Sequence, residues 1–64
     1  MKTLTLSQGT ALLYLRRNRG FQSFAASLKP GLNSLALMGL VNYSAETNQA
    51  EITADGIAYA YQYL

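Results

Sequence analysis

The sequence predicts a small α/β domain of the α+β type, in which helices surround one short β-hairpin. Apolar residues recur at helical spacing before residue 39 and again after residue 53. Between these segments, the stretch GLVNYSAETNQAEIT places a polar turn between two apolar runs. With 64 residues, half of them apolar, the chain fits a single domain, 1–64, with a core of its own.

The first predicted helix spans about Ser7–Asn18. Ser7 suits the N-cap, and Leu6 is expected to pack on the first turns as a hydrophobic staple. Four residues form the expected apolar stripe: Thr10, Leu12, Leu13 and Leu15. Gly20 then ends the helical segment.

A second helix is predicted at about Phe21–Leu28, because four apolar residues there follow the i, i+3, i+4, i+7 rule: Phe21, Phe24, Ala25 and Leu28. Pro30 breaks this helix and suits the first turn of a third one, which Gly39 ends. Three residues define the inner face of the third helix: Leu32, Leu35 and Ala36. The very short connection between the two is typical of a helix-turn-helix.

The β-hairpin is predicted from the alternation that follows Gly39. Leu40, Val41 and Tyr43 indicate the first strand, and residues 50–53 indicate the return strand, with Ile52 pointing inward. Residues 44–49 form the turn between them, and Asn48 is the best candidate for a left-handed backbone.

A last helix is predicted after the hairpin. Thr53 can cap it, Asp55 suits the positive end of its dipole, and Gly56 allows a close approach to the rest of the domain. Four residues form its expected buried stripe: Ile57, Ala60, Tyr61 and Leu64.

Two segments together resemble the bacterial and phage winged helix-turn-helix family, in which MarR-type and ArsR-type regulators are members. The family pattern L..L...GLV matches Leu32, Leu35, Gly39, Leu40 and Val41. The pattern LT..G.A, which closes the wing, is matched in part by Ile52, Thr53, Gly56 and Ala58. The resemblance runs from about Leu6 onward and implies three helices, a short β-hairpin wing and a C-terminal helix.

The resemblance implies a transcription regulator whose third helix enters the major groove of double-stranded DNA. Carried over by position, the base-reading residues are Lys29, Asn33 and Ser34. The start of the second helix would meet phosphates through Gln22 and Ser23. The wing tip would be formed by Thr47, Asn48 and Gln49. The resemblance also implies a homodimer through the C-terminal helix.

The charges depart from the family pattern. Ala36, Leu37 and Met38 stand where family members often carry arginine, and the wing has Glu46 and Glu51 but no cation. The net charge is only +2. Since DNA affinity depends on neutralised phosphates, we expect this module to bind weakly alone. The basic cluster at residues 16–19 is either a phosphate contact or a solvated helix end that suits the dipole.

The alternative function is a phage or bacterial protein-interaction adaptor or inhibitor on the same fold. Its surface would consist of Leu37, Met38, Tyr59 and Tyr63. Leu37 and Met38 also fit a wider buried stripe, and the two tyrosines fit either a dimer seam or the edge of the core.

Composition argues against other function classes. The chain has no histidine and no cysteine, so it lacks the usual general base, thiol nucleophile and soft metal ligands; we expect no enzyme, cofactor or metal site. The lack of cysteine fits a cytoplasmic protein. The N-terminus does not have the pattern of a signal peptide, and no apolar run is long enough for a membrane span. Met1 and the ordered end at Leu64 favour a full-length chain.

Overall fold

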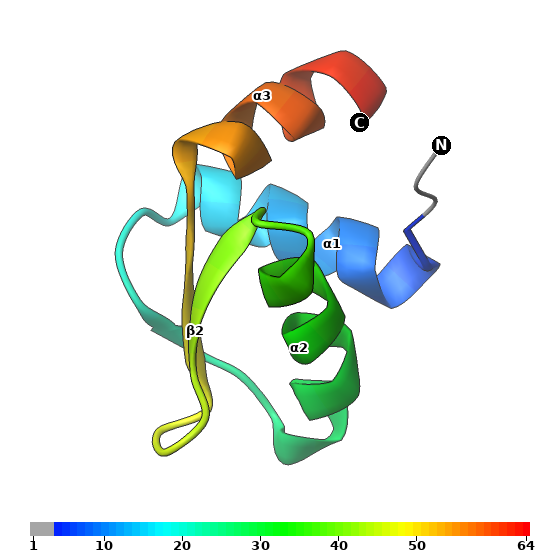
Figure 1. The fold of residues 1–64 in the computed structure, drawn as a ribbon. Coiled ribbons are helices and arrows are strands. Elements are labelled where there is room, and N and C mark those ends of the chain that lie inside the picture. Colours follow the sequence, from blue (N-terminus) through cyan, green and yellow to red (C-terminus); the bar gives the residue numbers. More distant parts are fainter. Residues whose placement is uncertain (1–3) are drawn as a thin grey trace.

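A computed structural model describes residues 4–64, which form three α-helices and a three-stranded antiparallel sheet (Figure 1). Residues 1–3, part of the stretch in which no signal peptide is predicted, lie outside this range. The elements in chain order are α1 (Leu6–Arg17), β1 (Gln22–Ser23), a 3-10 turn η1 (Ala26–Leu28), α2 (Lys29–Leu37), β2 (Val41–Ser44), β3 (Gln49–Ile52) and α3 (Ala54–Tyr63). This order confirms the α+β class and fits a winged-helix layout. Within residues 4–64, no helix combines the length and the apolar character needed to cross a membrane.

The sheet has the strand order β1-β3-β2, so β3 lies in the centre. The β2–β3 hairpin pairs Val41 with Ile52 and Ser44 with Gln49. On its other side, β3 pairs with β1, where Ser23 also meets Gln49. The hairpin is therefore held on both sides of its second strand.

The core lies between α1, α2, α3 and the inner face of the sheet (Figure 1). Its four fully buried large side chains come in pairs from α1 and α2: Leu12, Leu15, Leu32 and Leu35. Each such leucine contributes about 1.5–3 kcal/mol through burial. The predicted inner positions of the third helix, which is α2, are confirmed for Leu32 and Leu35.

Helix α1 begins one residue earlier than predicted, because Thr5 and not Ser7 is its N-cap. The Thr5 hydroxyl accepts from the Gln8 backbone N–H at 3.2 Å, and the Gln8 side chain accepts from the Thr5 N–H at 2.9 Å. This reciprocal pair is a capping box, which Ser7 could not form with Thr10 three residues on. Leu6 thus becomes a helical residue with 89% of its surface exposed, and the predicted staple is wrong. Thr10 is also exposed, and Ala11 takes its expected buried place.

The predicted helix at Phe21–Leu28 is wrong. The chain there forms β1, an extended connection and the single 3-10 turn η1. The Phe24 N–H donates to the Asn48 carbonyl at 3.1 Å, and Ala25 has the extended backbone angles φ −64° and ψ 147°. A helix this short is marginal without tertiary support, whereas the extended chain gains that support by pairing with β3.

The hairpin turn and the start of α3 agree with the prediction. Asn48 has the left-handed φ of 52°. The Thr53 hydroxyl caps α3 by accepting from the Gly56 N–H at 3.0 Å, and Asp55 lies in the first turn. A Cβ added to Gly56 would meet the Leu40 carbonyl oxygen at 2.1 Å, so only glycine fits this close approach.

The buried stripe of α3 is rotated from the predicted one. Gly56 and Ala60 are its buried residues, whereas Tyr61 is 75% exposed and Leu64 about half exposed. Tyr59, expected outside the inner face, is partly buried against the core. Small side chains at residues 56 and 60 bring this face of the helix closest to its neighbours, which turns Tyr61 outward.

Candidate functional site

The exposed face of α2 carries the three residues expected to read bases. Lys29 and Asn33 are exposed and one helical turn apart, and Ser34 beside them is half-buried. Within residues 4–64, none of these three side chains is used in a hydrogen bond or ion pair. Figure 1 shows the first turn of α2 and the hairpin tip at the same end of the molecule.

The predicted phosphate contacts Gln22 and Ser23 lie on β1 and not at a helix start. Their side chains take part in bonds within the fold. The Gln22 amide donates to the Arg19 carbonyl at 3.2 Å, and the Ser23 hydroxyl accepts from the Gln49 amide at 3.2 Å. No helix N-terminus adds backbone N–H groups at these two positions.

The hairpin tip is tied to the connection between β1 and η1. The Asn48 amide donates to the carbonyls of Phe24 at 2.7 Å and Ala25 at 3.0 Å. The Tyr43 hydroxyl donates to Asn48 Oδ1. The Thr47 hydroxyl lies 3.2 Å from Gln49 Oε1. Asn48 and Gln49 therefore brace the hairpin against residues 23–25, whereas the bonds of Thr47 stay within the hairpin.

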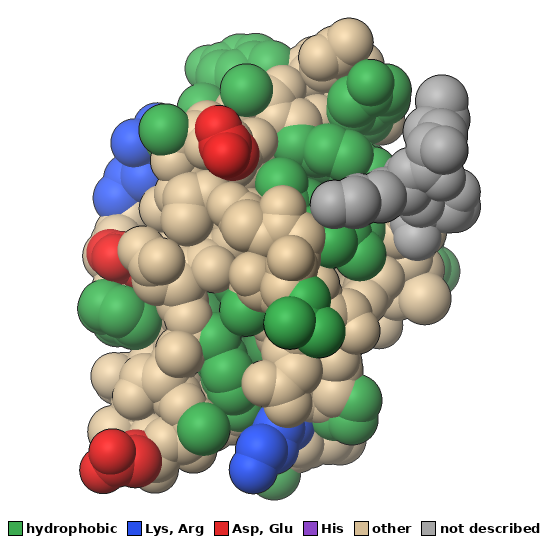
Figure 2. Space-filling view, viewed as in Figure 1, with side chains coloured by type: hydrophobic (Ala, Val, Ile, Leu, Met, Phe, Trp, Pro, Cys, Tyr) green, Lys and Arg blue, Asp and Glu red, His purple; other side chains and the backbone are tan. Residues whose placement is uncertain are grey.

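The charged residues do not gather into one cationic face. Lys29 is the only basic residue of α2 and the hairpin, which also carry Glu46 and Glu51. The arginines lie at the end of α1, where the Arg16 guanidinium stacks over the Tyr61 ring at 5.1 Å. Figure 2 shows Lys and Arg side chains in two separate places on this side of the molecule.

The residues expected to form a protein-binding surface are only partly brought together. Leu37, at the end of α2, is 90% exposed, while the neighbouring Met38 is partly buried against the core. Tyr59 and Tyr63 stack with their ring centroids 4.7 Å apart, and Tyr63 is half exposed. In each pair, Leu37–Met38 and Tyr59–Tyr63, one side chain is exposed and the other is partly buried, and Leu37 is the most exposed of the four.

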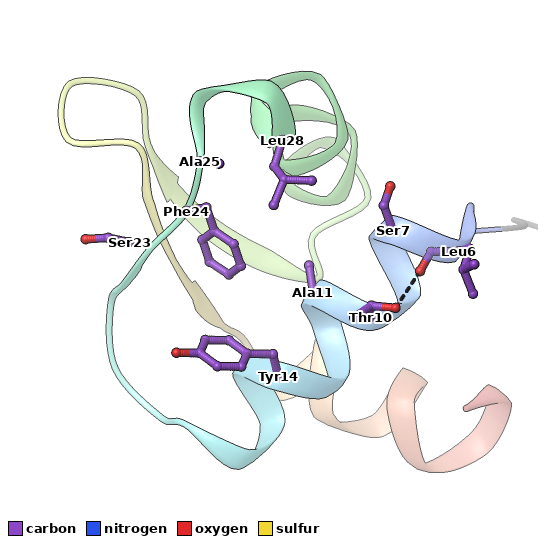
Figure 3. Close-up of a pocket in the computed structure, with 9 residues that line it drawn as sticks. All are labelled: Leu6, Ser7, Thr10, Ala11, Tyr14, Ser23, Phe24, Ala25 and Leu28. Atoms are coloured by element: carbon purple, nitrogen blue, oxygen red, sulfur yellow. Dashed lines mark hydrogen bonds between the residues drawn. The ribbon is translucent and has the colours of Figure 1, made fainter.

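A further concave surface, which the sequence reasoning did not find, lies beside α1 (Figure 3). This α1 groove has a volume of about 570 Å³ and is bounded by α1 and by residues 23–28. Its larger apolar side chains are Leu6, Tyr14, Phe24 and Leu28. The Tyr14 and Phe24 rings meet edge to face, with centroids 5.9 Å apart. The available sequence signal was the presence of apolar residues on both faces of α1.

Residues 4–64 contain no group of three Asp, Glu, His or Cys side chains placed to hold a metal ion. The two candidate surfaces are the polar face of α2 and the apolar α1 groove. Comparison of the chain with protein-family models, with curated proteins and with solved structures found no match.

Proposed function

We propose that this chain is a winged-helix module that binds duplex DNA through the exposed face of α2. The observation that supports the proposal is the set of uncommitted polar side chains on that face, Lys29, Asn33 and Ser34. An α-helix fits the major groove, where an asparagine can bond bidentately to adenine. Lys29, at the first turn, supplies the cation that a phosphate or a guanine edge would need.

The small number of cations limits the expected affinity. Each neutralised phosphate contributes about 0.9 to the slope of log K against log salt concentration. With Lys29 as the only cation of α2 and the hairpin, the slope should be close to one. Non-specific DNA affinities usually lie at about 10⁻⁴–10⁻⁶ M, and we expect this module at the weak end.

The hairpin is given a smaller part in this proposal than the family resemblance implies. Thr47, Asn48 and Gln49 make side-chain hydrogen bonds within the fold, and Glu46 in the same turn would repel phosphate. We therefore assign direct contacts to α2 and treat the hairpin as the brace that fixes how α2 is presented.

The test is a titration of isotope-labelled protein with mixed-sequence duplex DNA, followed by amide shifts at low and moderate salt. Shifts centred on residues 29–34 that fade with salt would support the proposal. An absence of shifts at low salt would reject DNA as the partner. Shifts centred on residues 16–19 would contradict the assignment to α2 and give the contact to the arginines of α1.

A pair of charge-matched variants sharpens this test. Lys29→Gln should lower the salt slope by about one unit. Arg17→Gln removes the same charge from an exposed residue at the end of α1 and should leave the slope unchanged. Asn33→Ala should reduce the difference in affinity between preferred and random DNA, since a bidentate base contact is worth about 1–3 kcal/mol. Unchanged discrimination would remove Asn33 from the base-reading set.

A second candidate function is a protein-interaction adaptor, favoured by the exposure of Leu37. A leucine that is 90% exposed adds nothing to the core, and burial against a partner would recover its hydrophobic free energy. Heparin retention and the solution mass separate the two candidates. Weak retention together with a dimer that Leu37→Lys dissociates would favour the adaptor, whereas salt-sensitive retention by a monomer would favour DNA.

A further inference from the structure

Helix α1 exposes large apolar side chains on its outer face. Ala11, Leu12 and Leu15 face the core, while Leu6 and Tyr14 lie on the other side, 89% and 46% exposed. The outer face also carries the polar residues Ser7, Thr10 and Arg17. Large exposed apolar side chains bordered by polar ones are typical of an interaction surface.

This face is one continuous surface. The α1 groove shares Thr10 and Tyr14 with a neighbouring depression of about 510 Å³. That second depression is also lined by Leu13 and Leu64, and it ends at Arg16 and Arg17. Apolar surface thus extends along most of α1, from Leu6 to the arginines, and continuous apolar patches of this kind mark interaction sites.

The charged side chains of this surface are basic and lie at one end of it. Among residues 4–64, no acidic side chain lines either depression, and Arg16 and Arg17 are their only charged side chains. Arg16 is held over the Tyr61 ring, whereas Arg17 is exposed and makes no hydrogen bond or ion pair in the part of the chain described. A complementary partner would present apolar side chains with a carboxylate at the end that lies over Arg17.

We propose that this surface is a docking site for an amphipathic helix of another protein, with an acidic residue in its first turn. A helix placed antiparallel to α1 would bring its own N-terminus to Arg17. An acidic residue there satisfies the arginine and also the positive end of the incoming helix dipole. The apolar side chains would follow at i, i+3 or i+4, and i+7, which is the helix-in-groove mode of recognition.

The position of the groove favours a helix as the occupant. Residues 21–28 have the apolar spacing of a helix but are extended apart from η1. The groove lies open between these residues and α1, so an incoming helix could pack there (Figure 3). An incoming helix would pack against α1 on one side and against Phe24 and Leu28 on the other.

Charge disfavours a second copy of this chain in the same place. Two α1 helices packed in parallel would bring their arginines together. Packed antiparallel, Arg17 of each copy would face the positive end of the other helix, whose first turn has no acidic residue. The acidic side chains lie elsewhere: Glu46 in the hairpin turn, Glu51 on β3 and Asp55 in the first turn of α3.

The experiment is a selection of displayed random peptides, each about four helical turns long, on the immobilised intact chain. Enriched peptides should share the apolar helical spacing and carry Asp or Glu in their first turn. The same selection on the Arg17→Glu variant should change that preference to Lys or Arg. An absence of enrichment, or apolar peptides without any charge preference on either protein, would overturn the proposal.

The best peptide is then titrated into labelled protein. Peptide binding should change the amide chemical shifts of residues 6–17 and 23–28. Arg17→Glu should weaken this binding by about fivefold or more. Leu6→Gln should weaken it by about tenfold, because the peptide would no longer bury this leucine. Leu37→Gln is the matched control, since Leu37 is as exposed as Leu6 but does not line the groove.

Two further outcomes would contradict the proposal. If Leu37→Gln lowers the affinity for the peptide and Leu6→Gln does not, the docking surface is on α2. If the free protein sediments as a dimer that Leu6→Gln alone dissociates, the occupant is a second copy. The proposal does not depend on DNA binding, because the test uses no DNA and its surface is α1.

Discussion

Gly56 lies where the start of α3 passes close to the backbone of Leu40, directly before β2, and of the glycines it leaves the least room for a side chain. A methyl group there would lie 2.1 Å from the Leu40 carbonyl oxygen and 2.7 Å from Ile52 Cγ1. Neither neighbour can move easily, because the Leu40 carbonyl accepts from the Thr53 N–H at 3.0 Å. The backbone of both segments would have to separate.

We therefore expect Gly56→Ala to destabilise the fold by about 1–3 kcal/mol or more, as overpacking does. The measurement is the midpoint of urea unfolding. Gly9→Ala is the matched control, because Gly9 is also helical and its added Cβ would meet only Leu64 Cδ2 at an ordinary 3.8 Å. That substitution should stabilise by about 0.5–1 kcal/mol. Equal effects of the two changes would contradict the steric explanation.

At this scale the sequence predicts residues well when their role depends on backbone conformation. Asn48 at positive φ, Gly56 at a close approach and Thr53 as a cap are all confirmed. The errors concern which neighbour a side chain meets. The choice of Ser7 over Thr5 missed that only Thr5 has a glutamine three residues on. The outward position of Tyr61 depends on how α3 packs against the rest of the domain, and the local sequence pattern does not determine this packing.

Helix α3 is fixed at its start by Thr53, which joins two elements with one hydroxyl group. The hydroxyl accepts from the Gly56 N–H at 3.0 Å and donates to the Gly39 carbonyl at 2.7 Å. Thr53 thereby links the connection between α2 and β2 to the beginning of α3. Loss of this group removes both a helix cap and a connection between elements.

We expect Thr53→Ala to lower the free energy of unfolding by about 1–2 kcal/mol, the upper part of the range for lost caps. Thr53→Ser keeps the hydroxyl and should stay within about 0.5 kcal/mol of the wild type. Urea denaturation of the three proteins measures both differences. An equal loss in the serine variant would show that the methyl group, and not the hydroxyl, is what matters.

Among the elements, the segment 21–28 shows why a helical pattern can fail. Its apolar spacing is correct for a helix, but Phe24 instead packs on Tyr14 and gives its N–H to the hairpin. That bond joins residues far apart in the chain, so no local window reveals it. The α1 groove was missed for the same reason, since it lies between α1 and this segment, which only the fold brings together. The helix that carries Lys29, Asn33 and Ser34 was predicted from its local pattern and is confirmed; Lys29 and Asn33 are exposed on it, and Ser34 is half-buried.

For the molecule as a whole, the sheet connects all parts of the chain. The centre strand β3 bonds to β1 and β2 and also contacts α1 and α3. Since a domain of this size buries a limited share of its surface, no part of it has a separate core.

We expect unfolding in a single cooperative transition. Urea midpoints measured by far-UV circular dichroism, which reports helices, and by near-UV dichroism of the five tyrosines should coincide. Three of these tyrosines lie on α3, one on α1 and one on β2, so the near-UV signal samples both ends of the chain. A separate earlier near-UV transition would contradict the view that the domain is one unit.

The strand order also has a consequence for synthesis. Both β1 and β2 pair only with β3, which is the last of the three strands to be made. A nascent chain that ends before Gln49 therefore has no sheet at all, although α1 and α2 are already complete. The sheet of this domain can therefore form only after β3 has been made, and a chain stalled before that point would expose the apolar faces of both helices to chaperones and proteases.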